Sequence, residues 1–128
     1  MLVLPRNHPL ARKRSLRLKD LSGVRLVVPH DRRPHRIMLS LALQSAGVDW
    51  EVAVEANGWE LMLHFVELEL GLAIVNECCR IPRGLVGRPL CELPVIRYFV
   101  FNLPGQSQSP AATLRDILLK YGSSWRRL

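Results

Sequence analysis

The stretch from Asn57 to Asn76, NGWELMLHFVELELGLAIVN, constrains the fold of this chain more than any other segment. Its polar residues Glu60, His64 and Glu67 recur at the i, i+4 and i+7 spacing of one helix face, and most other positions are apolar. This pattern predicts a helix from Gly58 to Leu70 with one narrow stripe facing solvent. A helix so apolar must be covered on most of its surface.

Both ends of this expected helix carry sequence signals. Asn57 can accept hydrogen bonds from the first free backbone N–H groups, and Glu60, three residues later, can complete a capping box. Gly71 suits a helix end that requires a positive φ, and the apolar run Leu72–Val75 after it is typical of a parallel strand buried on both faces. Helix, glycine and buried strand together predict half of a βαβ unit.

The rest of the chain alternates between strand and helix patterns. Helices are expected from Pro34 to Ala46 and from Pro110 to Tyr121, the second capped by Ser109 and buried through Leu114, Ile117, Leu118 and Tyr121. A frayed tail is expected from residue 122 onward. Single helical turns are expected at 20–23 and 78–80, and strands at 2–4, 24–28, 51–55, 85–90 and 97–103. Such alternation predicts an α/β layer fold with a mainly parallel sheet.

Length and composition fit one globular domain. The chain has 128 residues, of which 48% are hydrophobic and 23% charged, enough for a substantial core. No window holds eighteen uncharged apolar residues, and the first ten residues lack the apolar core of a secretory signal. Three cysteines, two of them adjacent, do not make a disulfide framework. A soluble protein of the reducing cytoplasm is therefore expected.

The net charge of +7 is unevenly distributed. Residues 1–36 carry ten Lys and Arg against two Asp, whereas residues 37–79 carry seven carboxylates and no Lys or Arg. A basic balance is compatible with nucleic acid or with anionic ligands. The basic residues are not interleaved with aromatic residues as single-strand binding requires, and solvated arginines on short loops are the simpler interpretation. A small basic domain that binds nucleic acid directly remains the alternative function.

Two loops are candidates for a binding site. Ligands of open α/β sheets sit beyond the carboxyl ends of the strands, and the loops Pro29–Pro34 and Ala56–Trp59 both follow predicted strands. Arg32 and Arg33 stand beside a helix N-terminus and could pair with an anion, or they could be plain surface charges. Asn57 could contact a ligand, cap its helix, or do both. The hypothesis requires the two strand ends to open onto the same crevice.

No arrangement of residues points to catalysis or to a cofactor. His30, Asp31 and His35 are spaced across a proline, which fits no usual metal-ligand pattern. The adjacent cysteines at 78 and 79 have no identifiable base and are expected to be inert, and His64 is expected to be solvated on the polar stripe. No nucleotide-binding or hydrolase motif occurs. We therefore expect no metal, no cofactor and no enzyme activity.

The order of these elements resembles the effector-binding (substrate-binding) domain of LysR-type transcriptional regulators. The run LPRNHPLA at 4–11 looks like the strand and HPLA turn of that family, and Leu16, Lys19, Asp20 and Leu21 look like its short helix. The run VELELGLAIVN at 66–76 is similar to its V-x-x-G-x-G-I-A-x-x-P turn, with Glu69 and Asn76 where the family usually has glycine and proline. The pieces Gly84–Leu85 and Pro89–Leu90 also match.

The resemblance implies a periplasmic-binding-protein-like fold of type 2 that closes on a small, often anionic, effector. Residues 1–11 would be a hinge strand and turn, residues 12–95 a Rossmann-like subdomain II, and residues 96–128 the returning strand and helix of subdomain I. The DNA-binding winged helix-turn-helix and the other half of the cleft would be absent, so the chain would be a fragment or a truncated product, and weak or no effector binding by it alone is expected. Carried over to matching positions, the effector contacts would be Leu4, Pro29, His30, Asp31, Arg32, Arg33, Asn57 and Gly58.

The resemblance also implies side-by-side pairing of effector domains. The helix expected after Pro34 is apolar around much of its circumference, which is consistent with a second covered face. The strand at 51–55 lies next in sequence. A homodimer or higher oligomer is expected to use Ile37, Met38, Leu41, Val52 and Val54.

Overall fold

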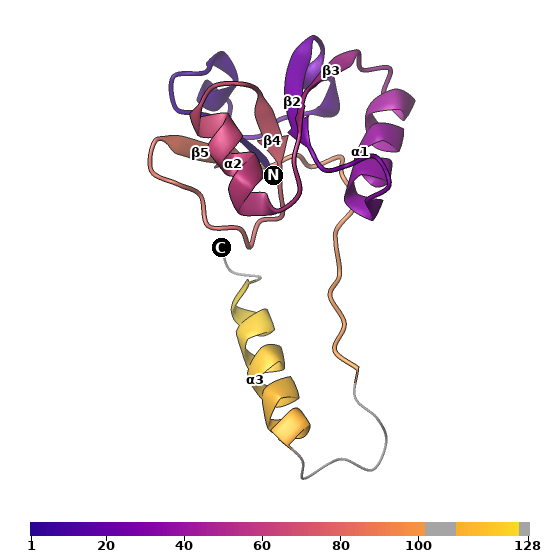
Figure 1. Ribbon diagram of the computed structural model, residues 1–128, viewed down its shortest axis with the longest axis vertical. Coiled ribbons are helices and arrows are strands. Elements are labelled where there is room, and N and C mark those ends of the chain that lie inside the picture. The colour runs from indigo at the N-terminus through magenta and orange to yellow at the C-terminus, as the bar shows by residue number, and fades with distance from the viewer. Residues whose placement is uncertain (102–109, 126–128) are drawn as a thin grey trace. The chain divides into compact units, whose positions relative to one another are not determined.

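The computed structural model describes residues 1–101 and 110–125, with side chains described as far as residue 122. The chain divides into two units, Met1–Pro94 and Val95–Leu128. The first unit holds the sheet and the helices that cover it (Figure 1). Each unit is described separately below.

A five-stranded sheet forms the centre of the first unit, in the order β3-β2-β4-β1-β5. Strand β2 pairs in parallel with β3 and β4, and β1 pairs antiparallel with β4 and β5. Four of the five strands therefore point the same way, as the sequence predicts for a mainly parallel sheet. The strands are β1 (Leu2–Pro5), β2 (Val24–Val28), β3 (Trp50–Glu55), β4 (Leu72–Ile74) and β5 (Leu85–Arg88).

Two apolar clusters fill the two faces of this sheet. Alternation along β1 sends Leu2 and Leu4 to one face and Val3 to the other, and all three are fully buried. Helix α1 (Pro34–Ser45) and the 3₁₀ turns η1 (Pro9–Arg12) and η2 (Leu18–Leu21) cover the first face. Helix α2 (Trp59–Glu67) covers the second. The unit is thus a three-layer α/β structure.

Helix α1 follows the sequence prediction closely. Pro34 occupies its first turn, where a missing N–H costs nothing, and its last turn closes on glycine. Gly47 has φ +63°, its N–H donates to the Gln44 carbonyl at 3.0 Å, and the Val48 N–H donates to the Leu43 carbonyl at 3.0 Å. These two bonds are the Schellman motif, which requires a left-handed residue at the position of Gly47.

Helix α2 differs from the prediction at both ends. Its N-cap is Gly58 with φ +94°, and no side chain caps it, so the Asn57–Glu60 capping box is wrong. The left-handed backbone at Gly58 moves the cap position one residue past the asparagine. The helix ends at Glu67 rather than Leu70.

The left-handed residue after α2 is Glu69, not Gly71. Glu69 has φ +57°, its N–H donates to the Val66 carbonyl at 3.0 Å, and the Leu70 N–H donates to the Phe65 carbonyl at 3.1 Å. This is the same Schellman motif that Gly47 closes after α1. Gly71 has a different role: a Cβ there would lie 2.9 Å from the Arg25 carbonyl oxygen, so glycine permits the close approach of β4 to β2.

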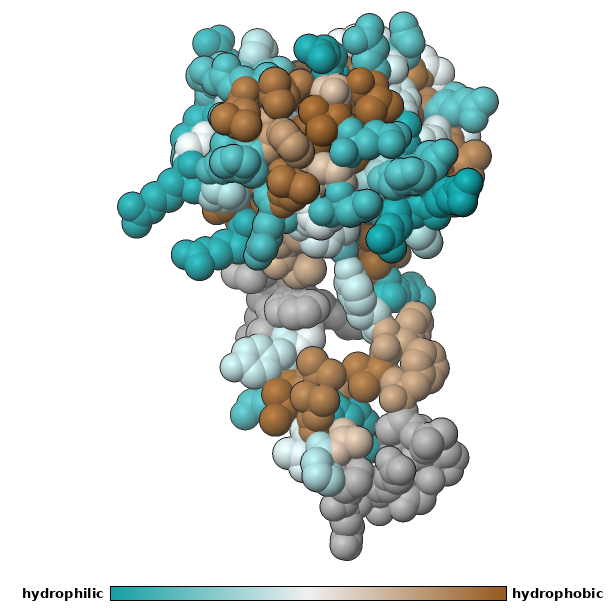
Figure 2. All heavy atoms as spheres, viewed as in Figure 1, coloured by the Kyte–Doolittle hydropathy of each residue, from teal (hydrophilic) through white to brown (hydrophobic). Residues whose placement is uncertain are grey.

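The second unit contains helix α3 (Pro110–Trp125), which begins at the predicted proline. Residues 95–101 form no strand, so the strand prediction for 97–103 is wrong over its described part, because no neighbouring strand is present there to pair with it. Leu103 and Ser109 lie outside the described residues. The backbone of residues 122–125 is helical rather than frayed. Figure 2 shows apolar side chains on α3, and the face predicted to be buried is exposed by 45–63%: Leu114, Ile117, Leu118 and Tyr121.

Shorter predicted elements have mixed outcomes. The turn expected at residues 20–23 is present as η2, two residues earlier, and Gly23 follows shortly after it with φ +72°. The helical turn expected around Cys78 is instead a single hydrogen-bonded turn, in which the Cys79 N–H donates to the Asn76 carbonyl at 3.0 Å. Both segments connect strands of the same sheet.

Candidate functional site

The carboxyl ends of β2 and β3 lie side by side. Val28 pairs with Glu55, and the Ala56 N–H donates to the Val28 carbonyl at 2.9 Å. The carboxyl end of β4 reaches the same edge, since β4 runs parallel to β2. The prediction that the strand ends at Pro29 and Ala56 open at one edge is confirmed.

Both covering helices begin at this edge, and their first turns touch. The His35 ring of α1 meets the Trp59 ring of α2 edge to face, with centroids 4.9 Å apart and planes at 85°. The Nδ1 atom of His35 is buried without a hydrogen-bond partner among the described residues. Burial lowers the pKa of His35, and the positive charge of the chain's amino terminus lowers it further. His35 is therefore favoured as the neutral ring.

The loop between β2 and α1 presents charged groups beyond the strand ends. His30 Nδ1 lies 2.7 Å from Asp31 Oδ1, and the Arg33 N–H donates to the His30 carbonyl at 3.0 Å, which closes a turn. Arg32 and Arg33 are exposed, and no side chain caps α1, so its first N–H groups are free for a ligand. Guanidinium groups beside a helix N-terminus can bind a carboxylate or phosphate.

The structure brings most of the predicted contact residues to this edge. The loop from Pro29 to Arg33 follows β2, and Asn57 and Gly58 follow β3, with Pro29 buried and the others exposed. Leu4 is the exception. It is fully buried, pairs with Val86, and lies toward the far end of β1, because β1 runs antiparallel to its neighbours. Leu4 is a core residue here and offers no ligand contact.

His35 and Trp59 are the residues of this edge that sequence reasoning did not select. In the sequence, His35 stands out only as a possible metal ligand, and Trp59 only as the last residue of the loop Ala56–Trp59. The signal was available: both stand in the first turn of a helix that starts at the carboxyl edge of adjacent parallel strands. First-turn side chains of two such helices meet above the strand ends.

The residues predicted for a dimer interface fall into two groups. Ile37, Leu41 and Val52 are exposed by 49%, 57% and 43%, and Met38 is partly buried. Val54 lies on the other face, because a bulge opposite Leu26 and Val27 interrupts the alternation of β3. Val54 packs with the α2 cluster and is not part of the surface that Ile37 and Leu41 form.

The part of the chain that the structure describes shows no grouped metal ligands, no activated thiol and no membrane-spanning helix. No three His, Cys, Asp or Glu side chains there are grouped to hold a metal ion. Cys78, Cys79 and Cys91 are free thiols, and burial raises the pKa of Cys79, which disfavours its reactive thiolate. None of the described helices has both the length and the apolar character needed to cross a bilayer.

The family model described as the LysR substrate binding domain matches residues 1–121. This chain belongs to that family. We call the carboxyl edge formed by residues 29–35 and 56–59 the effector edge, after the site predicted there from the sequence. Among curated proteins, no sequence matches the chain.

Solved structures with the same fold include regulatory domains with bound small molecules. The Synechocystis PCC6803 CcmR regulatory domain in complex with 2-PG superposes with a TM-score of 0.74 at 21% identity, over 94% of this chain and 61% of that one. The effector binding domain of QuiR in complex with shikimate gives 0.66 at 21% identity, over 96% and 60%. The C-terminal domain of a probable LysR family regulator from Rhodococcus sp. RHA1 gives 0.59 at 28% identity, over 72% and 47%.

These matches define how much of the domain the 128 residues represent. Almost the whole of this chain takes part in the first two matches, but it spans only about three-fifths of the length of those two regulatory domains. In a periplasmic-binding-protein-like domain, a ligand lies between two lobes.

Proposed function

We propose that this chain forms part of the effector-sensing, dimerising domain of a cytoplasmic LysR-type transcriptional regulator. In this role it binds a small organic anion at the effector edge and has no catalytic activity of its own. It would reach DNA only through a winged helix-turn-helix domain that these 128 residues do not include. The observation that carries the proposal is the convergence of two strand ends, two helix N-termini and two exposed arginines at one edge.

The charge of the expected effector follows from the groups at this edge. Free N–H groups at a helix N-terminus attract negative charge, and Arg32 and Arg33 add two cations next to them. Asp31 adds one negative charge to the same loop, and its carboxylate lies against the His30 ring. The relatives' ligands, 2-PG and shikimate, define the size class that we expect for this chain.

Binding by this chain alone should be weak. One wall supplies only part of the contacts, and the opposing lobe corresponds to the two-fifths of the relatives' domains that this chain does not cover. The second unit, residues 95–125, is proposed to return to that lobe. Its apolar residues would then be covered by the opposing lobe, whereas here Tyr98, Phe99 and Phe101 are 65–87% exposed.

The proposed dimer uses the outer surface of α1 and the neighbouring strand. Ile37, Leu41 and Val52 expose apolar side chains, and β3 is one of the two edge strands of the sheet. An edge strand offers unpaired backbone groups to a second chain. Side-by-side pairing at this surface leaves the effector edge open.

The direct test is a titration of the 128-residue protein with shikimate, monitored by backbone amide chemical shifts. Shifts should appear at residues 31–35 and 57–59, with a dissociation constant of about a millimolar or weaker. The double variant Arg32→Ala/Arg33→Ala should weaken binding by about tenfold, because it removes charged hydrogen-bond donors. The matched control Arg12→Ala/Arg14→Ala removes two exposed arginines from the η1 region and should leave binding unchanged.

Two results would contradict the proposal. Equal loss of binding in both double variants would show that only net charge matters. Calorimetry that gives micromolar affinity for any small organic anion would show that the site is complete without an opposing lobe.

A further inference from the structure

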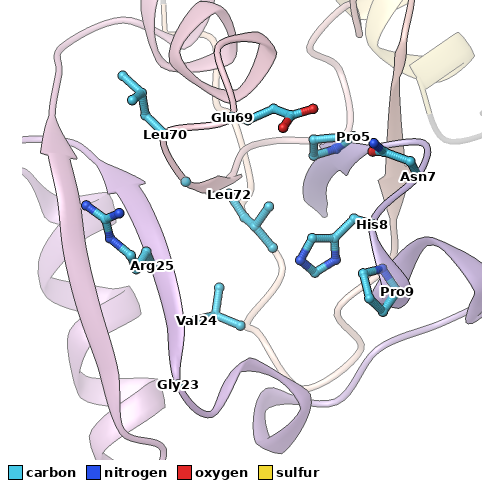
Figure 3. A pocket seen from close by; sticks show the side chains of 11 residues that line it. Pro5, Asn7, His8, Pro9, Gly23, Val24, Arg25, Glu69, Leu70 and Leu72 are labelled. Atoms are coloured by element: carbon cyan, nitrogen blue, oxygen red, sulfur yellow. The ribbon is translucent and has the colours of Figure 1, made fainter.

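A separate hollow of about 460 Å³ lies at the opposite edge of the sheet from the effector edge. Three chain segments line it: the turn after β1, the start of β2 and the turn that leads into β4. Figure 3 shows these segments around an open centre. A hollow of this volume is in the range of small-molecule sites. Nothing in the proposed effector function uses it.

The walls of this hollow are partly apolar and partly polar. Pro5, Pro9, Val24 and Leu72 line it, and the proline rings carry no N–H group. The side chain of Leu72 is 6% exposed, so the surface beneath the hollow continues into the core. An apolar ring or short alkyl chain could cover this surface and remove it from water.

A histidine and an asparagine supply polar groups at one side. His8 is held in place, since its Nδ1 accepts a hydrogen bond from the Leu10 N–H at 3.2 Å, and Figure 3 shows its ring next to Pro9 and opposite Val24. Burial lowers the pKa of His8, which favours the neutral ring near pH 7. Asn7 is exposed beside it. Neither group supplies a positive charge to the hollow.

Glu69 supplies the charge. In Figure 3 its side chain extends toward Pro5 and Asn7, whereas the guanidinium of Arg25 extends to the far side of β2. No ion pair or hydrogen bond engages the Glu69 carboxylate within the described residues. The hollow therefore combines apolar and polar walls with one carboxylate at its rim that pairs with no described residue.

The backbone of Glu69 adds a second observation. Its φ of +57° is one that glycine adopts freely and that other residues adopt at a cost. The equivalent position after α1 is a glycine, Gly47. Strained residues concentrate at ligand sites, where the side chain has a role that offsets the strain.

We propose that this hollow binds a small organic amine, with its ammonium group against the Glu69 carboxylate and its apolar body against Pro5, Val24 and Leu72. The Asn7 side-chain carbonyl accepts a second hydrogen bond from the ammonium group. A carboxylate ligand is disfavoured, because it would face the Glu69 carboxylate, whereas the guanidinium of Arg25, which also lines the hollow, extends to the far side of β2. The site is independent of the effector edge, so either proposal can fail without the other.

The test is an amide chemical-shift titration of the 128-residue protein with benzylamine at pH 7. Saturable shifts are expected at residues 7–9, 24 and 69–72. Benzyl alcohol and benzoate keep the ring but replace the cation. They should bind about two- to fivefold more weakly than benzylamine, the factor expected for losing an accessible ion pair. Equal binding of all three compounds, or no saturable shift at these residues, would overturn the proposal.

A pair of variants separates the carboxylate from general charge. Glu69→Gln keeps the side-chain size and the left-handed backbone and should weaken benzylamine binding by about fivefold. Glu67→Gln removes another exposed carboxylate two residues earlier, one that contacts His64 and does not line the hollow, and it should leave binding unchanged. Unchanged affinity in Glu69→Gln, or equal loss in both variants, would refute the assignment of Glu69.

Discussion

Replacing Glu69 by glycine should stabilise the protein, although glycine is usually a destabilising substitution. Glu69 closes the Schellman turn of α2 with φ +57°, and its side chain makes no ion pair among the described residues. Removing the side chain therefore relieves backbone strain and loses no described contact. The two backbone bonds of the turn, from Glu69 and Leu70, remain available to glycine.

The size of the effect follows from two opposing terms. A left-handed conformation costs a residue with a Cβ about 1–2 kcal/mol. Glycine also makes the unfolded chain more flexible, which lowers the free energy of unfolding by about 0.5–1 kcal/mol. The net gain in the free energy of unfolding should be about 0.5–1 kcal/mol. For a domain of this size that corresponds to a rise in melting temperature of about 2–5 °C.

Urea denaturation followed by circular dichroism measures this difference. Glu69→Gly should raise the midpoint without changing the slope. Two controls fix the interpretation. Glu67→Gly, inside the same helix, should lower stability by about 1 kcal/mol, and Gly47→Ala should lower it by about 1 kcal/mol through strain at the equivalent turn of α1. A midpoint for Glu69→Gly equal to or below that of the parent would refute the argument.

Three further predictions concern other parts of the first unit. Gly71→Ala should lower the free energy of unfolding by about 1–3 kcal/mol, measured by urea denaturation, because its Cβ would lie 2.9 Å from the Arg25 carbonyl oxygen. The free energy of unfolding should fall as pH drops below the ordinary histidine pKa of 6.5, because burial lowers the pKa of His35 in the folded protein and the unfolded chain binds the proton first. The variant His35→Phe should make the free energy of unfolding depend less on pH in this range, and it should keep the ring contact with Trp59. Leu41→Glu should weaken self-association in sedimentation equilibrium, whereas Leu61→Glu, on α2 and similarly exposed, should not.

Periodicity predicted the core of the first unit well, and for a physical reason. Continuous apolar runs such as Leu72–Val75 can only be buried on both faces, and the run after Pro34 repeats at helical spacing, so the element types follow from burial alone. The shared edge of the strand ends follows from topology, because parallel neighbours place their carboxyl ends together. The position of the candidate effector residues 29–33, 57 and 58 was predictable to that extent.

Local details failed where backbone conformation, not burial, decides the outcome. Asn57 looked like a cap, but the left-handed backbone at Gly58 moved the helix start beyond it. Val52 and Val54 looked like one face of a strand, and a bulge between them placed them on two faces. Residues 97–101 have strong strand propensity, yet a strand needs a partner, and their own unit offers none among the described residues.

The hollow beside Glu69 could not be predicted from the sequence, because it depends on the order of the strands in the sheet. It exists because β1 runs against its neighbours and brings its own carboxyl end, with Asn7 and His8, to the edge where β2 and β4 begin. No repeat or motif in the sequence specifies that β1 lies between β4 and β5. The one local feature of the sequence that pointed to this hollow was Glu69, a glutamate at a position where the LysR family usually has glycine. A residue with a strained backbone, at a turn that glycine would close at lower cost, is a reason to examine what its side chain faces, and here that surface is an open hollow with apolar and polar walls.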